Sequence, residues 1–80
     1  MRLDKFLKVS RLLKRRSVAN DACSEGCVEV NGKASKPGNR LKIGDILTIT
    51  LGQTTLKVEV VELNEKASKA NAGTLYKVIE

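Results

Sequence analysis

Apolar residues at the start of the chain recur with the period of a helix. Leu3, Phe6 and Leu7 stand at positions i, i+3 and i+4. This spacing predicts a helix with one apolar face. The pattern leaves two possibilities for its end. Either the helix continues through the next pair of leucines, or it breaks between Ser10 and Arg16.

A second, shorter helix is predicted over Val18 to Ser24. Ser17 is placed to cap its N-terminus, and Asp21 favours the start of the helix. Gly26 tolerates the left-handed conformation with which many helices end. Small apolar side chains form a narrow stripe that would let this helix lie close to the first: Val18, Ala19, Ala22 and Cys23.

From Cys27 the apolar period changes to two, which is typical of strands. Residues 33–38 are polar and favour a loop or an irregular edge, and Asn64 to Gly73 favours a mobile loop. The predicted strands are residues 27–30, 46–51, 56–60 and 75–79. The predicted turns are Asn31-Gly32, which favours type I′, then Ile43-Gly44-Asp45 and Gly52-Gln53.

These elements predict an α+β fold, with two short N-terminal helices packed on a small, mostly antiparallel sheet. A length of 80 residues suits a single domain, expected over residues 1–80. The longest apolar runs are too short to span a membrane. The charged N-terminus lacks the features of a signal peptide, so we expect a cytoplasmic protein.

The excess of positive over negative charge is confined to the start of the chain. Residues 1–16 hold seven basic groups and one acid, a net of +6, whereas the rest of the chain holds eight of each. Such a cationic density attracts and holds polyanions. The candidate phosphate-binding residues are Arg2, Lys5, Lys8, Arg11, Lys14, Arg15 and Arg16, together with Lys33 and Lys36 beside the Asn31-Gly32 turn.

The one acid of this basic segment, Asp4, lies in the first turn of the first predicted helix. A carboxylate there suits the positive end of the helix dipole and can pair with Lys8 at i+4. A solvated helix face normally mixes charges of both signs. The nearly uniform sign of this segment therefore favours a binding surface.

The scarcity of aromatic residues narrows the kind of partner. Phe6 and Tyr76 are the only two, whereas proteins that bind single strands stack bases on several rings. The composition favours a folded RNA recognised by shape and phosphate position. A peripheral role on an anionic membrane is the alternative, but the domain needs the apolar face of the first helix for its own core.

Enzymatic chemistry finds no support in the residue types. The chain has no His, and no Ser, Thr or Cys stands beside a recognisable base. The glycines match neither of the common nucleotide-binding fingerprints. Two cysteines are too few for a zinc site or a disulfide framework, so we expect no cofactor and a Cys23 packed in the core.

Several separated motifs resemble the S4-like RNA-binding domain, also called the αL RNA-binding motif. The resemblance is specific because the motifs occur in the same order, and it covers residues 2–51, with residues 52–80 as C-terminal strands. The motifs are Arg2-Leu3-Asp4-Lys5-Phe6-Leu7, Lys14-Arg15-Arg16 with Ala19 downstream, Gly26-x-Val28-x-Val30-Asn31-Gly32 and Gly44-Asp45-x-Leu47.

Within that family the chain is most similar to the RqcP (YabO-type) group of ribosome-associated quality control proteins. It also resembles the heat-shock S4-like proteins. The resemblance implies a monomeric, non-catalytic factor on large ribosomal subunits that carry peptidyl-tRNA, contacting rRNA and tRNA and supporting alanine tailing by an RqcH-type tailing factor. It places Arg2, Lys5, Arg11, Lys14, Arg15 and Arg16 at the RNA, with Asp4 orienting Arg2 or Arg16.

Two residues depart from the family pattern. Cys27 stands where family members often carry a basic residue, and Gly38 stands where a Ser often follows the proline. The resemblance therefore does not extend to a phosphate contact at Cys27, and it implies fewer hydrogen bonds in the loop at Gly38. A broader alternative is therefore kept, in which the chain is a general structured-RNA-binding module acting with a separate translation or RNA-modifying enzyme.

Overall fold

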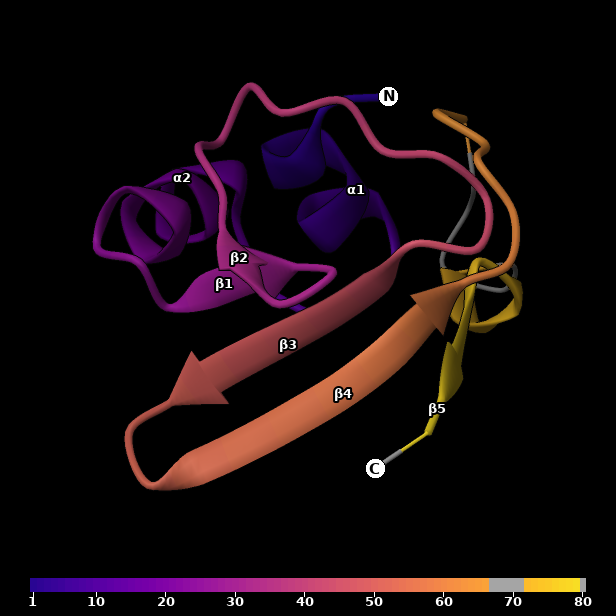
Figure 1. Cartoon of the computed structure of the whole chain (residues 1–80). Helices are drawn as coiled ribbons and strands as arrows, with labels where there is room; N and C mark the ends of the chain where they lie inside the picture. The colour runs from indigo at the N-terminus through magenta and orange to yellow at the C-terminus, as the bar shows by residue number, and fades with distance from the viewer. Residues whose placement is uncertain (67–71, 80) are drawn as a thin grey trace.

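The computed structural model describes residues 1–66 and 72–79. Two helices lie on one side of a five-stranded antiparallel sheet, as Figure 1 shows. The strand order is β2-β1-β3-β4-β5, and the arrangement confirms the predicted α+β class. The elements are α1 (Leu3–Val9), α2 (Arg16–Ser24), β1 (Val28–Val30), β2 (Lys33–Ala34), β3 (Ile46–Leu51), β4 (Thr54–Val60), η1 (Ala72–Thr74) and β5 (Tyr76–Val78).

The register of the sheet gathers its apolar residues on one face. Val28 pairs with Ile49, and Leu47 pairs with Val58. Paired residues point to the same face of a sheet, and all four of these side chains are buried. The apolar side of α1, with Phe6 fully buried, belongs to the same core. This shared core fixes the basic N-terminal segment on the sheet.

The first helix ends early, which confirms the second of the two possibilities. Its last residue is Val9, and Arg11 then adopts a left-handed conformation with φ of 64°. The N–H of Leu13 donates to the carbonyl of Leu7 at 3.0 Å, and the Leu13 side chain is buried. The chain therefore folds back over the end of α1, because this brings Leu13 into the core.

The second helix begins two residues before its predicted start. Arg15 is its N-cap residue, with an extended backbone and no capping hydrogen bond from its side chain. The prediction that Ser17 caps the helix is therefore wrong. Arg15 is the last extended residue of the connection, so helical geometry is already set at Arg16 and Ser17 falls within the first turn.

The apolar stripe of α2 is narrower than predicted. Val18 is 43% exposed, whereas the other three stripe residues, Ala19, Ala22 and Cys23, are buried. Gly26 ends the helix as predicted, with φ of 78°. The N–H of Cys27 then donates to the carbonyl of Ala22 at 2.9 Å, a bond typical of a Schellman motif.

The Asn31-Gly32 turn joins β1 to a short edge strand, β2. Both residues have positive φ, 53° and 85°, as a type I′ turn requires. The Asn31 side chain also donates to Asp45 at 3.2 Å and accepts the N–H of Ile46 at 3.0 Å. Two turns that the sequence predicts separately are therefore one hydrogen-bonded unit.

The C-terminal part completes the sheet. β4 begins at Thr54, two residues earlier than predicted, because its pairing with β3 continues to Leu51 at the Gly52-Gln53 turn. β5 pairs antiparallel with β4, as expected for the last edge strand. Of the loop expected over residues 64–73, residues 67–71 lie outside the described residues.

Candidate RNA-binding surface

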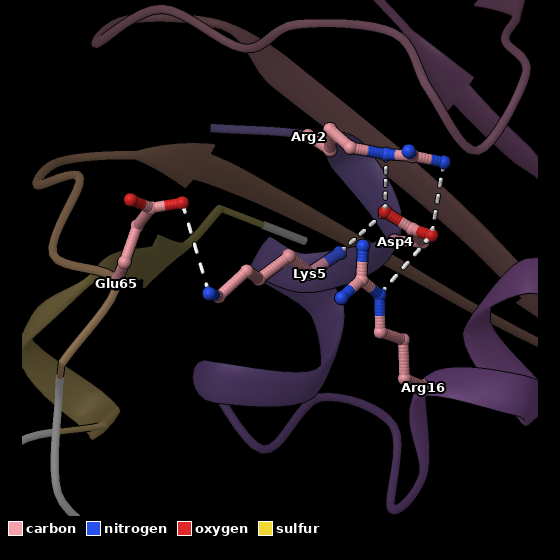
Figure 2. A network of polar contacts seen from close by, with 5 residues as sticks. All are labelled: Arg2, Asp4, Lys5, Arg16 and Glu65. Carbon is pink, nitrogen blue, oxygen red and sulfur yellow. Dashed lines mark hydrogen bonds and ion pairs between the residues drawn. The ribbon is translucent and has the colours of Figure 1, made fainter.

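A buried carboxylate, Asp4, lies between two arginines at the start of the helical layer. Its side chain is 3% exposed, and it forms ion pairs with Nε of Arg2 at 3.3 Å and with Nε of Arg16 at 3.4 Å. It also accepts the N–H of Lys5 at 2.8 Å. Figure 2 shows the two guanidinium groups converging on this carboxylate, one from the residue before α1 and the other from the first residue of α2.

The two guanidinium groups remain accessible although they share this carboxylate. The Arg2 and Arg16 side chains are each 49% exposed. A guanidinium group has five N–H donors, so each arginine keeps donors for an anion in solution. The buried carboxylate therefore fixes the direction of two cations without neutralising both of them.

The ionisation of Asp4 depends on these contacts. Burial alone would raise the pKa of this carboxyl group, but the N–H of Lys5 and the charges of Arg16 and Arg2 outweigh burial and lower the pKa below its usual 3.8. At neutral pH Asp4 is therefore a carboxylate that accepts hydrogen bonds and donates none. The sequence suggested Lys8 as its ion-pair partner. The ion pairs instead go to Arg2 and Arg16, and Lys8 is exposed.

This carboxylate predicts an acid-sensitive part of the stability. Because the folded-state pKa of Asp4 lies below the unfolded value of 3.8, its contribution is present above that value and is lost as pH falls through the folded-state pKa. We expect Asp4→Asn to lower the free energy of unfolding by about 1–2 kcal/mol at pH 7. Urea unfolding should show this gap closing as the pH falls below 3.8 and through the folded-state pKa of Asp4. A gap that keeps the same size over this range would contradict the assignment.

The connection between the helices carries three further cations. Arg11, Lys14 and Arg15 are all exposed, whereas Leu13 between them is buried. An apolar anchor thus holds a loop whose charged side chains face solvent. Arg16 follows at once as the first residue of α2, so these cations and the Asp4 cluster belong to one continuous stretch of the chain.

Lys5 does not join the Asp4 cluster. Its ammonium group lies 3.8 Å from the carboxylate of Glu65, and Figure 2 shows it pointing away from Arg2 and Arg16. Lys33 and Lys36 are exposed. The carbonyl of Pro37, next to Lys36, accepts the N–H of Asp4 at 3.1 Å. Lys36 therefore directly precedes the residue whose carbonyl binds the backbone of Asp4. Lys33 lies in the edge strand β2.

A hollow beside the Asp4 cluster is lined by α2 residues as well as by the arginines. Its lining residues are Arg2, Asp4, Arg16, Ser17, Asn20 and Asp21. No sequence motif connects the last three of these with RNA binding. The same holds for Arg40, which pairs with Arg2 across an isolated antiparallel bridge. Only the folded chain brings residues 2 and 40 together, so no local pattern could have indicated it.

The cysteines fit a structural role. Cys23 is buried, as predicted. Burial, followed by the nearby charges of Asp4 and Cys27, raises the pKa of the Cys23 thiol to about 11. The thiol is therefore protonated at neutral pH and unreactive. Over residues 1–66 and 72–79, no cluster of three or more metal-binding side chains occurs.

The apolar side of α1 is not available to a membrane. Leu3, Phe6 and Leu7 are each fully buried in the domain's own core. An interfacial helix must instead present such residues to the lipid. None of the described helices has the length and apolar character needed to cross a bilayer. These observations weigh against the membrane alternative.

The fold and this cationic surface define a small nucleic-acid-binding α+β domain, and comparison with known proteins places it in a family. The S4 domain model matches residues 1–47, and the chain belongs to the S4 domain family. One relative is the RQC P-site tRNA stabilizing factor of Halalkalibacterium halodurans, which is 50% identical over 98% of this chain and 89% of its own length.

Two other proteins extend the comparison. The RQC P-site tRNA stabilizing factor of Bacillus subtilis is 42% identical over the whole of this chain and 93% of its own. The solved trimeric structure of heat shock protein 15 from Vibrio cholerae superposes with a TM-score of 0.92 at 30% identity, covering 99% of this chain and 81% of that one. The predicted similarity to both groups is therefore confirmed.

Proposed function

We propose that this protein binds large ribosomal subunits that carry peptidyl-tRNA, contacts rRNA and tRNA, and supports ribosome-associated quality control in the cytoplasm. It acts by binding and positioning, as a monomer and without catalysis, while an RqcH-type tailing factor adds alanine to the stalled chain. The names of its relatives and its membership of the S4 domain family support this role.

The observation that carries the proposal is the Arg2–Asp4–Arg16 cluster. Two half-exposed guanidinium groups are held by one buried carboxylate, so their orientation is set before RNA arrives. Preorganised side chains lose less entropy when they bind. The surface proposed to contact RNA comprises Arg2, Lys5, Lys8, Arg11, Lys14, Arg15, Arg16, Lys33 and Lys36, with Asp4 as the orienting residue.

If phosphate contacts supply the affinity for RNA, that affinity should depend steeply on salt concentration. Each neutralised phosphate releases condensed counterions, so affinity falls as salt rises. We expect the logarithm of the affinity for large subunits to fall against the logarithm of salt concentration with a slope of about −3 to −6. Sedimentation binding at several KCl concentrations between about 50 and 300 mM measures this slope. A slope near zero would exclude phosphate clamping as the source of affinity.

Co-sedimentation distinguishes the quality-control role from general RNA binding. The protein should sediment with large subunits that carry peptidyl-tRNA and bind empty large subunits less tightly. It should remain in the supernatant with anionic liposomes at the same salt concentration. Equal affinity for both kinds of subunit and for an unrelated folded RNA would contradict the specific role. Adding the tailing factor should increase retention on the loaded subunits only.

A further inference from the structure

The start of the chain is joined to the segment before β3 by a short antiparallel bridge between Arg2 and Arg40. The hydrogen bonds of this bridge come from the flanking residues. The N–H of Leu3 donates to the backbone carbonyl of Asn39 at 2.7 Å, and the N–H of Leu41 donates to the backbone carbonyl of Met1 at 2.9 Å. Arg2 and Arg40 are therefore a non-hydrogen-bonded pair. In such pairs the Cα atoms are only about 4.5 Å apart and the side chains are close.

This pairing places two like charges together. Side chains of directly opposed residues lie on the same side of a bridge, and like charges in that position are destabilising. Arg2 shares Asp4 with Arg16. Arg40 is exposed, and within the described part of the chain no acidic side chain forms an ion pair with it. Asp4 therefore pairs with two of the three arginines, and the charge of Arg40 is unbalanced.

The Arg2 side chain is held in place on this bridge. Besides its ion pair with Asp4, its guanidinium group lies against the loop at Gly38, where an added Cβ would be 3.7 Å from Nη2 of Arg2. The carboxylate and this loop together restrict the movement of the Arg2 side chain. The repulsion between the two cations is therefore relieved best by an anion that binds both.

We propose that Arg40 binds an RNA phosphate together with Arg2, which makes the bridge an anion-binding site in addition to Arg16 and the basic loop 11–15. The inference rests on the proposed RNA-binding function and extends its surface to a residue remote in sequence. Guanidinium pairs suit a phosphodiester because each group can donate two parallel hydrogen bonds to its oxygens. An anion bound by both groups would thus explain why two like charges occupy a non-hydrogen-bonded pair, where cross-strand side chains lie closest together.

The test is Arg40→Ala, measured for affinity, salt dependence and thermal stability. We expect affinity for large subunits to fall about tenfold and the salt slope to become shallower by about 1, as for the loss of one phosphate contact. The melting temperature should stay the same or rise, because a like charge is removed. Arg40 makes none of the hydrogen bonds of the bridge, so alanine leaves the backbone pairing intact. Arg40→Lys should keep the slope but not the full affinity.

Arg16→Ala serves as the benchmark that separates this inference from the proposed function. If Arg16→Ala weakens binding while Arg40→Ala binds within twofold of the wild type with an unchanged slope, the Arg40 site is wrong and the RNA-binding function stands. If neither variant changes binding, the proposed surface itself is wrong. A clear drop in the melting temperature of Arg40→Ala would show that Arg40 is structural and overturn the inference.

Discussion

Replacing Arg16 with alanine should weaken binding to large ribosomal subunits by about 10- to 100-fold, the range expected for losing a charge-assisted hydrogen bond to phosphate. Stability should change by less than about 1 kcal/mol, because the Arg16 side chain is half exposed and Asp4 keeps its contact with Arg2. Sedimentation binding at fixed salt measures the first effect, and thermal unfolding followed by circular dichroism measures the second.

Two control variants make this result specific. Lys77→Ala removes the same charge from an exposed position on β5, on the sheet face opposite the helices, and should leave affinity within about twofold. Arg16→Lys keeps the charge but loses the planar fork, so its affinity should lie between those of the wild type and the alanine variant. Equal loss of binding in the Arg16 and Lys77 alanine variants would show that only net charge matters.

Truncation of Leu13 to alanine should damage both stability and binding. The Leu13 side chain is 5% exposed in the core, and its N–H holds the turn after α1 through the carbonyl of Leu7. Leucine-to-alanine changes at such sites cost about 2–5 kcal/mol. Because Leu13 anchors the loop that carries Arg11, Lys14 and Arg15, we expect a further loss of RNA affinity at temperatures where the variant is still folded.

The neighbouring leucine provides the control for this variant. Leu12 is half buried against the core, so Leu12→Ala should cost less than Leu13→Ala in urea unfolding. Its effect on RNA affinity should be small, because the Leu12 side chain is only partly buried and anchors the loop less than Leu13 does. If folded Leu13→Ala binds large subunits as tightly as the wild type, the orientation of the basic loop does not matter for binding.

The secondary structure could be predicted where local chemistry decides it. The β-branched run Ile46–Leu51 matches β3 at both ends, and the Asn31-Gly32 pair adopts the two positive φ values that its turn requires. Gly26 ends α2 for the same local reason. The start of α2 at Arg16 could not be predicted in this way, because the end of the preceding connection sets it and not the capping preference of Ser17.

The candidate surface could be predicted as a charged segment but not as a geometry. The distribution of charged residues along the sequence alone places the excess positive charge in residues 1–16. The burial of Asp4, its two arginine partners and the turning away of Lys5 toward Glu65 all depend on tertiary contacts. The pairing of Arg2 with Arg40 likewise depends on two segments that are far apart in the sequence. A short-range sequence pattern cannot indicate it.

Position-specific crosslinking on the ribosome tests the central claim most directly. A photoreactive residue in place of Lys14, on the basic loop, should crosslink to rRNA or tRNA of large subunits that carry peptidyl-tRNA. The same residue in place of Lys77, on the opposite sheet face, should give little RNA crosslinking. If position 77 captured RNA and position 14 did not, the basic N-terminal segment would not be the surface that this protein uses.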